Sequence, residues 1–395
     1  MTTHTIYLFN PDHDLALANG DENFDPPSLA QTFASDVACL PLWYAAPGDM
    51  VLASLKEPQW FSQIHALFPQ IEDVRVYSSP DFSLLDEVVP WGWDAVVRKK
   101  LKVLGAGDRL LPSKNRLDEV RRLSHRRTAI DALQFLNDDE ELAPFLPPVG
   151  RELLADEVKD FAIQYAPVVF KAPWSGSGRG LFWCSGNLSE NALGWCRNVA
   201  KKQGCVMGER AYPKVLDFAM EFKTIDGKVS FEGYSLFETD SQGIYQRNLL
   251  VSDHFILKTV TGYISIDLLM KVQIRLQQFI QKKIASCYSG YLGVDMLIYR
   301  KEEAFYLHPC VEINLRMTMG MVARIFYDRF VYPSQSGTLS VDYFSSSCEL
   351  MQDHLYTEKQ QPLRVEDGRI TQGYLSLSPV SDKSHYRVKV LIGRE

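Results

Sequence analysis

The chain has 395 residues, 46% hydrophobic and 23% charged, which are ordinary values for a globular protein and predict two or three domains. Its net charge of −7 and the lack of a long basic run argue against nucleic acid or an anionic membrane as a partner. The start, MTTHTIYLFNPDHD, has no basic region followed by an apolar segment, which predicts a cytoplasmic protein. The seven cysteines are scattered without a C-x-x-C pair, which is typical of reduced thiols.

The first 113 residues alternate short apolar runs with helical segments, which predicts an α/β domain with a largely parallel sheet. Polar residues follow the first run, where open α/β sheets bind ligands: Asn10, Asp12, His13, Asp14 and Asn19. We consider them candidates for binding a substrate. Capping of the following helix by Asp12 or Asp14 explains the same pattern equally well. A zinc site lacks a second cluster of ligands.

Residues 117–138 show helical spacing with a break near Ser124, and a proline-rich connection follows. From Ala166 the pattern changes to hairpins. The clearest joins DFAMEFKT to KVSFEGYSLF through an Asp-Gly turn, Asp226 and Gly227. A long amphipathic helix is predicted over 265–287, and the last 50 residues are typical of a terminal β unit.

The stretch VVFKAPWSGSGRGLFW, residues 168–183, places Lys171 at the end of an apolar run and before three closely spaced glycines. It matches neither a P-loop nor a dinucleotide fingerprint, because no lysine follows the glycines and the next segment is strand-like. We predict a strand, a loop and a strand. Free backbone amides with Lys171 and Arg179 would suit an anion, while an ordinary mobile hairpin tip remains the alternative.

A second polar group lies in GVDMLIY and CVEINLR, two predicted strands around the turn at 301–303. Glu312 and Asn314 are two residues apart and project from one side of their strand, where Asp295 joins them if the strands pair. These oxygens suit Mg²⁺ or Mn²⁺. Arg316 has the same facing and could neutralise a phosphate or an oxyanion. On the opposite side we expect apolar residues that imply a buried sheet: Cys310, Val311, Ile313 and Leu315.

The lysine before a Gly/Ser loop, then GERAY, GVD and EINLR in this order, resembles the ATP-grasp superfamily over residues 114–325. The resemblance implies an α/β chain with an α+β ATP-grasp fold: a preceding parallel-sheet α/β domain (1–113), an ATP-grasp domain (114–345, flap subdomain about 150–215) and a β unit (346–395). It implies an ATP-dependent ligase that joins a small carboxylate to an amine through an acyl phosphate, releasing ADP and phosphate. A small-molecule kinase and a non-catalytic nucleotide-binding module are the alternatives, and a homodimer is left open.

The resemblance also implies roles for individual residues. Those expected to bind ATP are Arg126, Lys171, Ser175, Gly176, Ser177, Gly178, Arg179, Gly180, Glu209, Ala211, Tyr212 and Asp217. The implied metal ligands are Asp295, Glu312 and Asn314, and the implied catalytic residues are Arg316, Arg247 and Lys171. Trp174, at the base of the flap, joins the amino-terminal candidates for substrate binding. The sequence departs from the family where His125 and Arg126 replace an Asp-Lys pair, and where Asp217 replaces a glutamate.

Overall fold

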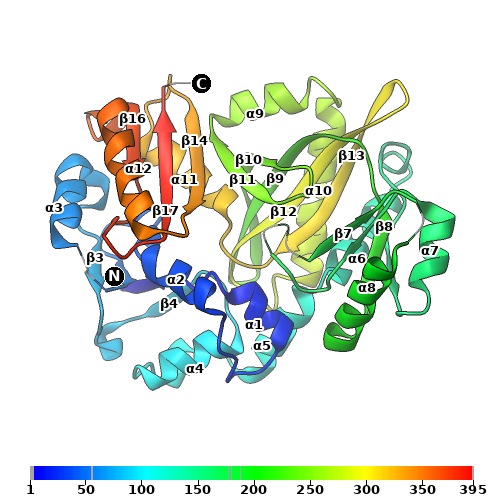
Figure 1. The fold of residues 1–395 in the computed structure, drawn as a ribbon, viewed down its shortest axis with the longest axis horizontal. Coiled ribbons are helices and arrows are strands. Elements are labelled where there is room, and N and C mark those ends of the chain that lie inside the picture. The colour runs from blue at the N-terminus through cyan, green and yellow to red at the C-terminus, as the bar shows by residue number, and fades with distance from the viewer. Residues whose placement is uncertain (1–3, 55–56, 177, 179, 187, 394–395) are drawn as a thin grey trace.

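The computed structural model describes residues 4–54, 57–176, 178, 180–186 and 188–393, arranged around three β-sheets (Figure 1). The sheets follow one another along the chain, so that the amino-terminal sheet, a small sheet and a large sheet form three neighbouring units. No helix among the described residues has the length and apolar character needed to cross a bilayer.

The amino-terminal sheet is parallel and has the strand order β3-β2-β1-β4. Its strands are β1 (Thr5–Leu8), β2 (Met50–Leu52), β3 (Arg75–Tyr77) and β4 (Glu87–Pro90), and its helices are α1 (His13–Asn19), α2 (Ser28–Asp36), α3 (Pro58–Leu67) and α4 (Ala95–Val103). The apolar residues that predicted the strands are buried, because each strand has neighbours on both faces. This confirms the predicted parallel α/β unit.

The small sheet is antiparallel, in the order β5-β8-β6-β7. Its strands are β5 (Arg151–Leu153), β6 (Val168–Lys171), β7 (Leu181–Cys184) and β8 (Val206–Arg210). Helices α7 (Val158–Tyr165) and α8 (Glu190–Gln203) contribute to its apolar core. Two helices precede it, α5 (Lys114–Leu123) and α6 (Arg127–Asn137), and the interruption between them confirms the predicted break near Ser124.

The large sheet has nine strands in the order β13-β12-β9-β10-β11-β14-β17-β16-β15. They are β9 (Lys214–Ile225), β10 (Lys228–Thr239), β11 (Tyr245–Leu250), β12 (Gly290–Lys301), β13 (Ala304–Asn314), β14 (Gly337–Tyr343), β15 (Arg364–Glu366), β16 (Arg369–Ser376) and β17 (Tyr386–Ile392). The predicted hairpin is β9 and β10, and its turn residues Asp226 and Gly227 have φ of 50° and 75°. The strands of the terminal segment thus continue this sheet.

Helices cover the large sheet. One core contains α9 (Asp253–Val260), the predicted amphipathic helix α10 (Ile266–Lys283), and the alternate apolar residues of β9, β12 and β13. Helix α11 (Met319–Phe330) lies on another core, and α12 (Ser347–Gln360) packs near β16. Because alternate residues of a strand face opposite sides, the polar residues between those apolar positions project to the face where α11 begins.

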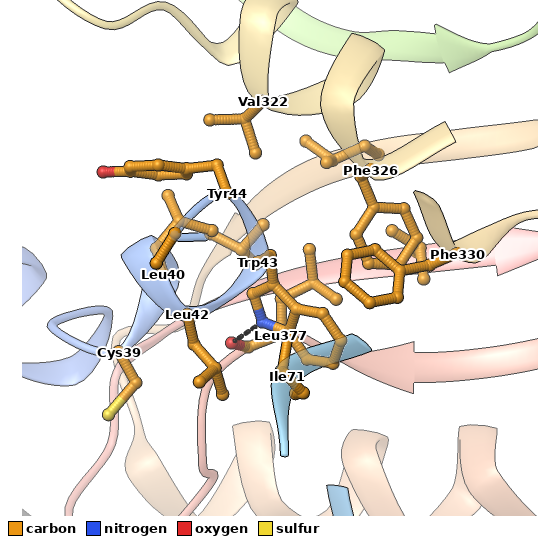
Figure 2. Close-up of a cluster of buried hydrophobic side chains, with 14 of the residues drawn as sticks. Cys39, Leu40, Leu42, Trp43, Tyr44, Ile71, Val322, Phe326, Phe330 and Leu377 are labelled. Carbon is orange, nitrogen blue, oxygen red and sulfur yellow. Dashed lines mark hydrogen bonds between the residues drawn. The ribbon is translucent and has the colours of Figure 1, made fainter. Parts of the chain in front are cut away.

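A single hydrophobic core joins the amino-terminal unit to α11 and the carboxyl-terminal strands (Figure 2). Trp43 is fully buried in it, packs edge-on against Phe330 with the ring centres 5.2 Å apart, and donates from Nε1 to the Leu377 carbonyl at 2.7 Å. Phe9, four residues before α1, and Met317, three residues after β13, both lie in this core, so it ties the segment that leads into α1 to the segment that follows β13. The division of the chain at residues 113 and 345 stays a prediction.

Candidate active site

The loop between β6 and β7 closes an antiparallel pair, as predicted. At its base Ala172 donates its amide to the Gly180 carbonyl at 2.8 Å. Gly178 and Gly180 have φ of 72° and 82°, a region that favours glycine. A Cβ on Gly178 would also overlap with the backbone of Gly243, so the loop lies against the β10–β11 turn. Ser177 and Arg179 lie outside the described residues.

A cleft of about 320 Å³, the first cleft, opens between the small sheet and the large one. It is lined by Arg126, Ala129, Ile130, Leu133, Gly150, Lys171, Met207, Gly208, Glu209, His308, Cys310 and Val311. The pattern of apolar walls with a few charged groups is typical of small-molecule sites. Cys310 and Val311 line this cleft, so their predicted place on the opposite side from Glu312 is wrong. Cys310 is two residues before Glu312, so alternation itself puts both on one face. For Val311 the alternation is interrupted, because the register of β12 and β13 shifts between Asp295 and Leu297.

Lys171 and Glu209 form a buried ion pair across β6 and β8 in the first cleft. Burial would raise the pKa of Glu209, but the Lys171 ammonium and the His308 imidazole, 3.8 Å away, outweigh it and lower the pKa to about 2. His308 is 3% exposed, and its Nδ1 has no hydrogen-bond partner in the described structure. The ammonium and this imidazole nitrogen are polar groups that a bound ligand could contact.

The residues expected to bind the nucleotide beside Glu209 each contact another part of the protein. The amide of Ala211 donates to the Pro167 carbonyl at 2.8 Å, and the ring of Tyr212 packs on Tyr299 with centres 4.2 Å apart. Asp217 accepts from Thr239 Oγ1 at 2.8 Å. The Ala211 amide is therefore not available as a hydrogen-bond donor to a purine ring.

The predicted metal ligands meet on one face of the hairpin β12–β13. Asp295 pairs with Glu312 across the strands, and Asn314 Nδ2 donates to Asp295 Oδ2 at 3.1 Å. Burial, then the charges of Glu312 and Glu221, raise the pKa of Asp295 to about 8. A divalent cation fits the Asp295 carboxyl group beside Glu312, because the charge of the cation would remove the penalty for ionising Asp295. The oxygen set that was predicted from alternation is present.

Arg126 connects this carboxylate face to the base of the flap. It is 6% exposed, contacts Glu312 at 2.8 Å, and donates to the Ala172 carbonyl and to Ser175 Oγ, both at 2.6 Å. Its Nε has no partner in the described structure. The guanidinium thus lies between the flap and the predicted metal ligands, where the family places a lysine.

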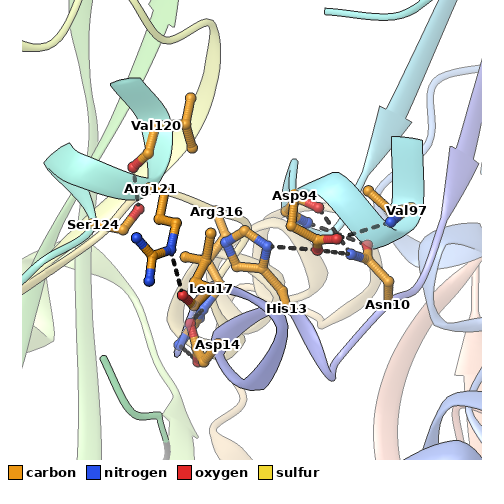
Figure 3. Close-up of polar contacts among 11 residues, drawn as sticks. Asn10, His13, Asp14, Leu17, Asp94, Val97, Val120, Arg121, Ser124 and Arg316 are labelled. Carbon is orange, nitrogen blue, oxygen red and sulfur yellow. Dashed lines mark hydrogen bonds and ion pairs between the residues drawn. The ribbon is translucent and has the colours of Figure 1, made fainter. Parts of the chain in front are cut away.

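The amino-terminal candidates divide into two groups (Figure 3). His13 and Asn10 turn inward: His13 Nδ1 lies 3.0 Å from Asp94 Oδ2, and Asn10 Nδ2 donates to the Gly92 carbonyl at 2.8 Å. Asp14 points the other way and forms a two-contact ion pair with Arg316, at 3.1 and 3.0 Å. The pair joins α1 to the residues that follow β13.

The remaining amino-terminal candidates, Asp12 and Asn19, make fewer side-chain contacts. Asp12 precedes α1, but its side chain makes no capping hydrogen bond, and Asp14 is occupied by Arg316. Asn19 accepts from the amide of Asp21 at 3.1 Å in an exposed turn. The structure therefore gives no support for side-chain capping of α1.

A second cleft, of about 260 Å³, lies between α1 and the end of β13. It is lined by His13, Asp14, Leu17, Ser124, Trp174, Ser175, Glu312, Ile313, Asn314 and Leu315. Trp174 donates from Nε1 to the Arg121 carbonyl at 2.9 Å, and the Arg121 guanidinium lies 4.2 Å from the ring centre. Glu312 and Asn314 border this cleft, and Arg126, which borders the first, contacts Glu312 at 2.8 Å, so the two clefts are neighbours across that ion pair.

Arg247 lines neither cleft. It lies on β11, is about half exposed, and forms a two-contact ion pair with Glu238 of β10 at 2.8 and 3.1 Å. Its predicted action on a phosphoryl group would require this exposed pair to open.

Glu221 is a buried acid that the sequence argument missed. It is 1% exposed and accepts from Ser235 Oγ at 2.8 Å and Thr318 Oγ1 at 3.0 Å. A Cβ on Gly293 would lie 2.9 Å from its carboxylate, and one on Gly320 would overlap with it. Burial raises its pKa to about 7, against these hydrogen bonds and the charge of Arg316. One feature could have pointed to it: Glu221 lies on β9 two residues beyond Ala219, and Ala219 pairs with Asp295.

Another group of potential metal ligands comprises His125, Glu152 and Cys205. Its nearest atoms are the His125 Nε2, the Cys205 Sγ 3.8 Å away and the Glu152 Oε1 4.0 Å away. The amide of Arg127 donates to His125 Nδ1 at 3.0 Å, so in the neutral ring the proton is on Nε2, which faces the group. A metal would need that position free, so we do not assign a site there.

The three sheets, the flap loop and the carboxylate face together make up the ATP-grasp fold, and comparison with solved structures confirms this prediction. No family model matches the sequence, and no curated protein matches it. The carboxyaminoimidazole synthetase of Staphylococcus aureus, complexed with ADP, matches 100% of this chain and 95% of its own, with a TM-score of 0.50 and 12% identity.

Two other solved structures match this chain with similar coverage and identity. The biotin carboxylase of Campylobacter jejuni, complexed with a β,γ-ATP compound, matches 99% of this chain and 88% of its own, with a TM-score of 0.51 and 13% identity. The biotin carboxylase domain of the Hydrogenobacter thermophilus 2-oxoglutarate carboxylase, complexed with MgADP and bicarbonate, matches 100% and 87%, with a TM-score of 0.50 and 11% identity. At these identities the likeness establishes the fold and leaves the substrates open.

Proposed function

We propose that the protein is an ATP- and magnesium-dependent ligase that joins a small carboxylate to an amine or a similar nucleophile. The observation that carries the proposal is the grouping of Asp295, Glu312 and Asn314 on one face of the hairpin β12–β13. Arg126, which lines the first cleft together with Lys171, contacts Glu312 of this group. Solved structures of the same fold hold ADP or an ATP compound, which supports a nucleotide in the first cleft.

In this proposal the nucleotide enters the first cleft and exchanges contacts with the groups already there. Lys171 leaves Glu209 and pairs with phosphate oxygens, while the flap amides at Ser175, Gly176, Gly178 and Gly180 close over them. Glu209 then accepts from the adenine amino group. Asp217 receives the ribose hydroxyls in place of its present donor, Thr239.

The residues of the carboxylate face would hold magnesium. Asp295, Glu312 and Asn314 supply three oxygens, and the remaining positions suit phosphate oxygens and water. Bound there, the ion would offset charge on the phosphoryl group that is transferred.

The chemistry then needs no covalent attachment to the protein. An oxygen of the substrate carboxylate attacks the γ-phosphorus, the bond to the β,γ-bridging oxygen breaks, and ADP leaves. The nucleophile adds to the acyl carbon, loses its proton, and expels phosphate. Arg316 and Arg126, both buried beside the carboxylate face, provide positive charge where the oxyanions form.

The proposal is tested by incubating the protein with MgATP, hydroxylamine and a panel of small carboxylates. Hydroxylamine captures an acyl phosphate as a hydroxamate, which is measured by its iron(III) colour, and ADP is measured in parallel. We expect a hydroxamate and an equal amount of ADP with at least one carboxylate. A stable phosphorylated product would instead indicate a kinase, and binding of MgATP without any product would indicate a nucleotide-binding module.

A further inference from the structure

We propose that the second cleft binds an α-amino acid, whose carboxylate takes the place of Asp14 on Arg316 and whose ammonium group pairs with Asp14. This inference rests on the proposed function and names the class of its carboxylate substrate. It starts from the ion pair of Asp14 and Arg316 (Figure 3). Asp14 lines the second cleft, and Arg316 follows Leu315, another residue of its lining.

The ion pair presents its two charges in a sheltered place. The side chain of Arg316 is 13% exposed and that of Asp14 is 25% exposed, and both oxygens of Asp14 contact the guanidinium. The flap also reaches this point, since a Cβ on Gly176 would overlap with the Asp14 carboxylate. Asp14 therefore contacts the flap and the carboxylate face together, where a reacting carboxylate must lie.

The charges of the pair favour a zwitterion over a ligand with a single charge. A simple carboxylate on Arg316 would leave Asp14 unpaired near Glu312, and a partly buried carboxylate without a partner is costly. A simple amine on Asp14 would leave Arg316 unpaired in the same way. An α-amino acid carries both groups on neighbouring atoms, so its insertion replaces each partner with a group of the same charge.

The charge state of Asp14 is consistent with this role. Burial would raise its pKa, but the charges of Arg316 and His13 and the hydrogen bonds from Arg316 outweigh burial and lower the pKa. The group is ionised at neutral pH and can hold an ammonium cation.

The rest of the cleft limits the size of the amino acid. It is bounded by the apolar side chains of Leu17 and Leu315 and by Trp174. The indole is fixed by its hydrogen bond to the Arg121 carbonyl and by the Arg121 guanidinium over its face. A rigid wall of this kind suits a small or medium side chain.

The same arrangement determines which group of the amino acid reacts. An ammonium group paired with Asp14 stays protonated and is not a nucleophile, whereas the carboxylate on Arg316 lies beside Glu312 and Asn314. The amino acid is therefore the acyl donor, and its carboxylate oxygen attacks the γ-phosphorus with loss of ADP. The nucleophile of the second step is a different molecule.

The test is a calorimetric titration with matched ligands: an α-amino acid, the carboxylic acid that lacks its amino group, and the amine that lacks its carboxylate. L-Alanine, propionate and ethylamine are one such set, and sets based on serine, leucine and phenylalanine follow. Each is titrated with and without MgADP. We expect one amino acid to bind about tenfold more tightly, or better, than either truncated ligand. Equal binding of the amino acid and the acid, or no binding in any set, overturns the proposal.

The variant Asp14→Asn separates recognition from a structural ion pair. We expect it to weaken binding of the amino acid about tenfold while leaving the truncated acid unchanged, so that discrimination is lost. Asp12→Asn is the matched control, because Asp12 adjoins the same helix, has no capping contact and does not line the cleft. Equal weakening of both ligands by Asp14→Asn contradicts the proposal. If that variant does not fold, the wild-type ligand series decides alone.

Failure here and failure of the proposed function are distinguishable. Amino acid binding without hydroxamate formation supports this cleft and contradicts the ligase. Hydroxamate formation only from acids that lack an amino group supports the ligase and overturns the amino acid.

Discussion

The residues that line the first cleft lie closer together in the sequence than those that line the second. The first is lined by residues between Arg126 and Val311, from α6, the small sheet and β13. The second sets His13, Asp14 and Leu17 of the amino-terminal unit against the end of β13, about three hundred residues later. The first cleft therefore depends on two neighbouring sheets, and the second depends on how the amino-terminal unit is held.

Each cleft contains one ion pair that a ligand can open. In the first, Lys171 and Glu209 lie on adjacent strands of one sheet, and in the second, Asp14 and Arg316 come from separate units. A pair within a sheet keeps its geometry when the units shift, whereas a pair between units does not. We expect substitutions in the first cleft to affect only the binding and turnover of the nucleotide. We expect substitutions where the amino-terminal unit packs against the large sheet to affect the second cleft.

The largest effect is expected from Lys171→Met, which removes the cation of the first cleft. Loss of a preorganised charge at the transferred phosphoryl group lowers turnover about 10²–10³-fold. The measurement is ADP release under saturating MgATP. Lys102→Met is the matched control, because Lys102 is an exposed lysine of α4 that pairs with Asp108. Retention of full turnover in Lys171→Met would contradict the role given to the first cleft.

The next effect is expected from Glu312→Gln, at the carboxylate face. The amide keeps the size of the side chain but loses the charge that binds magnesium, so we expect the magnesium needed for half-maximal stabilisation by ATP to rise about 10–100-fold. Thermal shift over a magnesium series measures it. Glu303→Gln, in the exposed turn of the same hairpin, is the control. An unchanged magnesium requirement would place the metal elsewhere.

A smaller effect concerns Glu221, beside the carboxylate face. Its pKa is raised to about 7 in the folded protein from an ordinary 4.5. At pH values between 4.5 and 7 the folded state therefore keeps a proton that the unfolded state releases. Stability therefore falls as pH rises through this window and levels off above pH 7, by about 3 kcal/mol in all. Glu221→Gln should remove this component of the pH dependence. Urea unfolding at pH 5, 6, 7 and 8 tests it, and identical slopes in both proteins would refute it.

The sequence predicted the carboxylate face better than the contact between α1 and the residues that follow β13, for a physical reason. Alternation along a strand places Glu312 and Asn314 on one face, and the Asp-Gly turn fixes a hairpin, because both signals depend on near neighbours. The contact of Asp14 with Arg316 spans 302 positions and depends on packing of the core around Trp43. Nothing local encodes such a contact, so Asp14 could only be one candidate among several.

Local rules also failed where a strand is irregular or a group is fully buried. Val311 lines the first cleft, against the expected alternation, where the register of β12 and β13 shifts. Glu221 looks like an ordinary polar residue of a strand in the sequence. Only the structure shows that Gly293 and Gly320 leave room for its carboxylate.

The smallest effect is expected from Trp43→Phe, in the core that joins the amino-terminal unit to the large sheet. The change removes the hydrogen bond from Nε1 to the Leu377 carbonyl, at 2.7 Å, and leaves that buried carbonyl without its donor. We expect a loss of about 1 kcal/mol in the free energy of unfolding. Because this core ties the segment that leads into α1 to the segment that follows β13, the affinity of the second cleft for its carboxylate ligand should fall, while the affinity of the first cleft for MgATP stays unchanged.

The matched control for that variant is Trp195→Phe, which alters the separate core of the small sheet, where Trp195 packs near Phe182. Calorimetric titration of both ligands into both variants gives four affinities. If the two clefts depend on different cores, only the second-cleft affinity of Trp43→Phe changes. A loss of MgATP affinity in Trp43→Phe that equals its loss of carboxylate affinity would mean that the two clefts respond as one body.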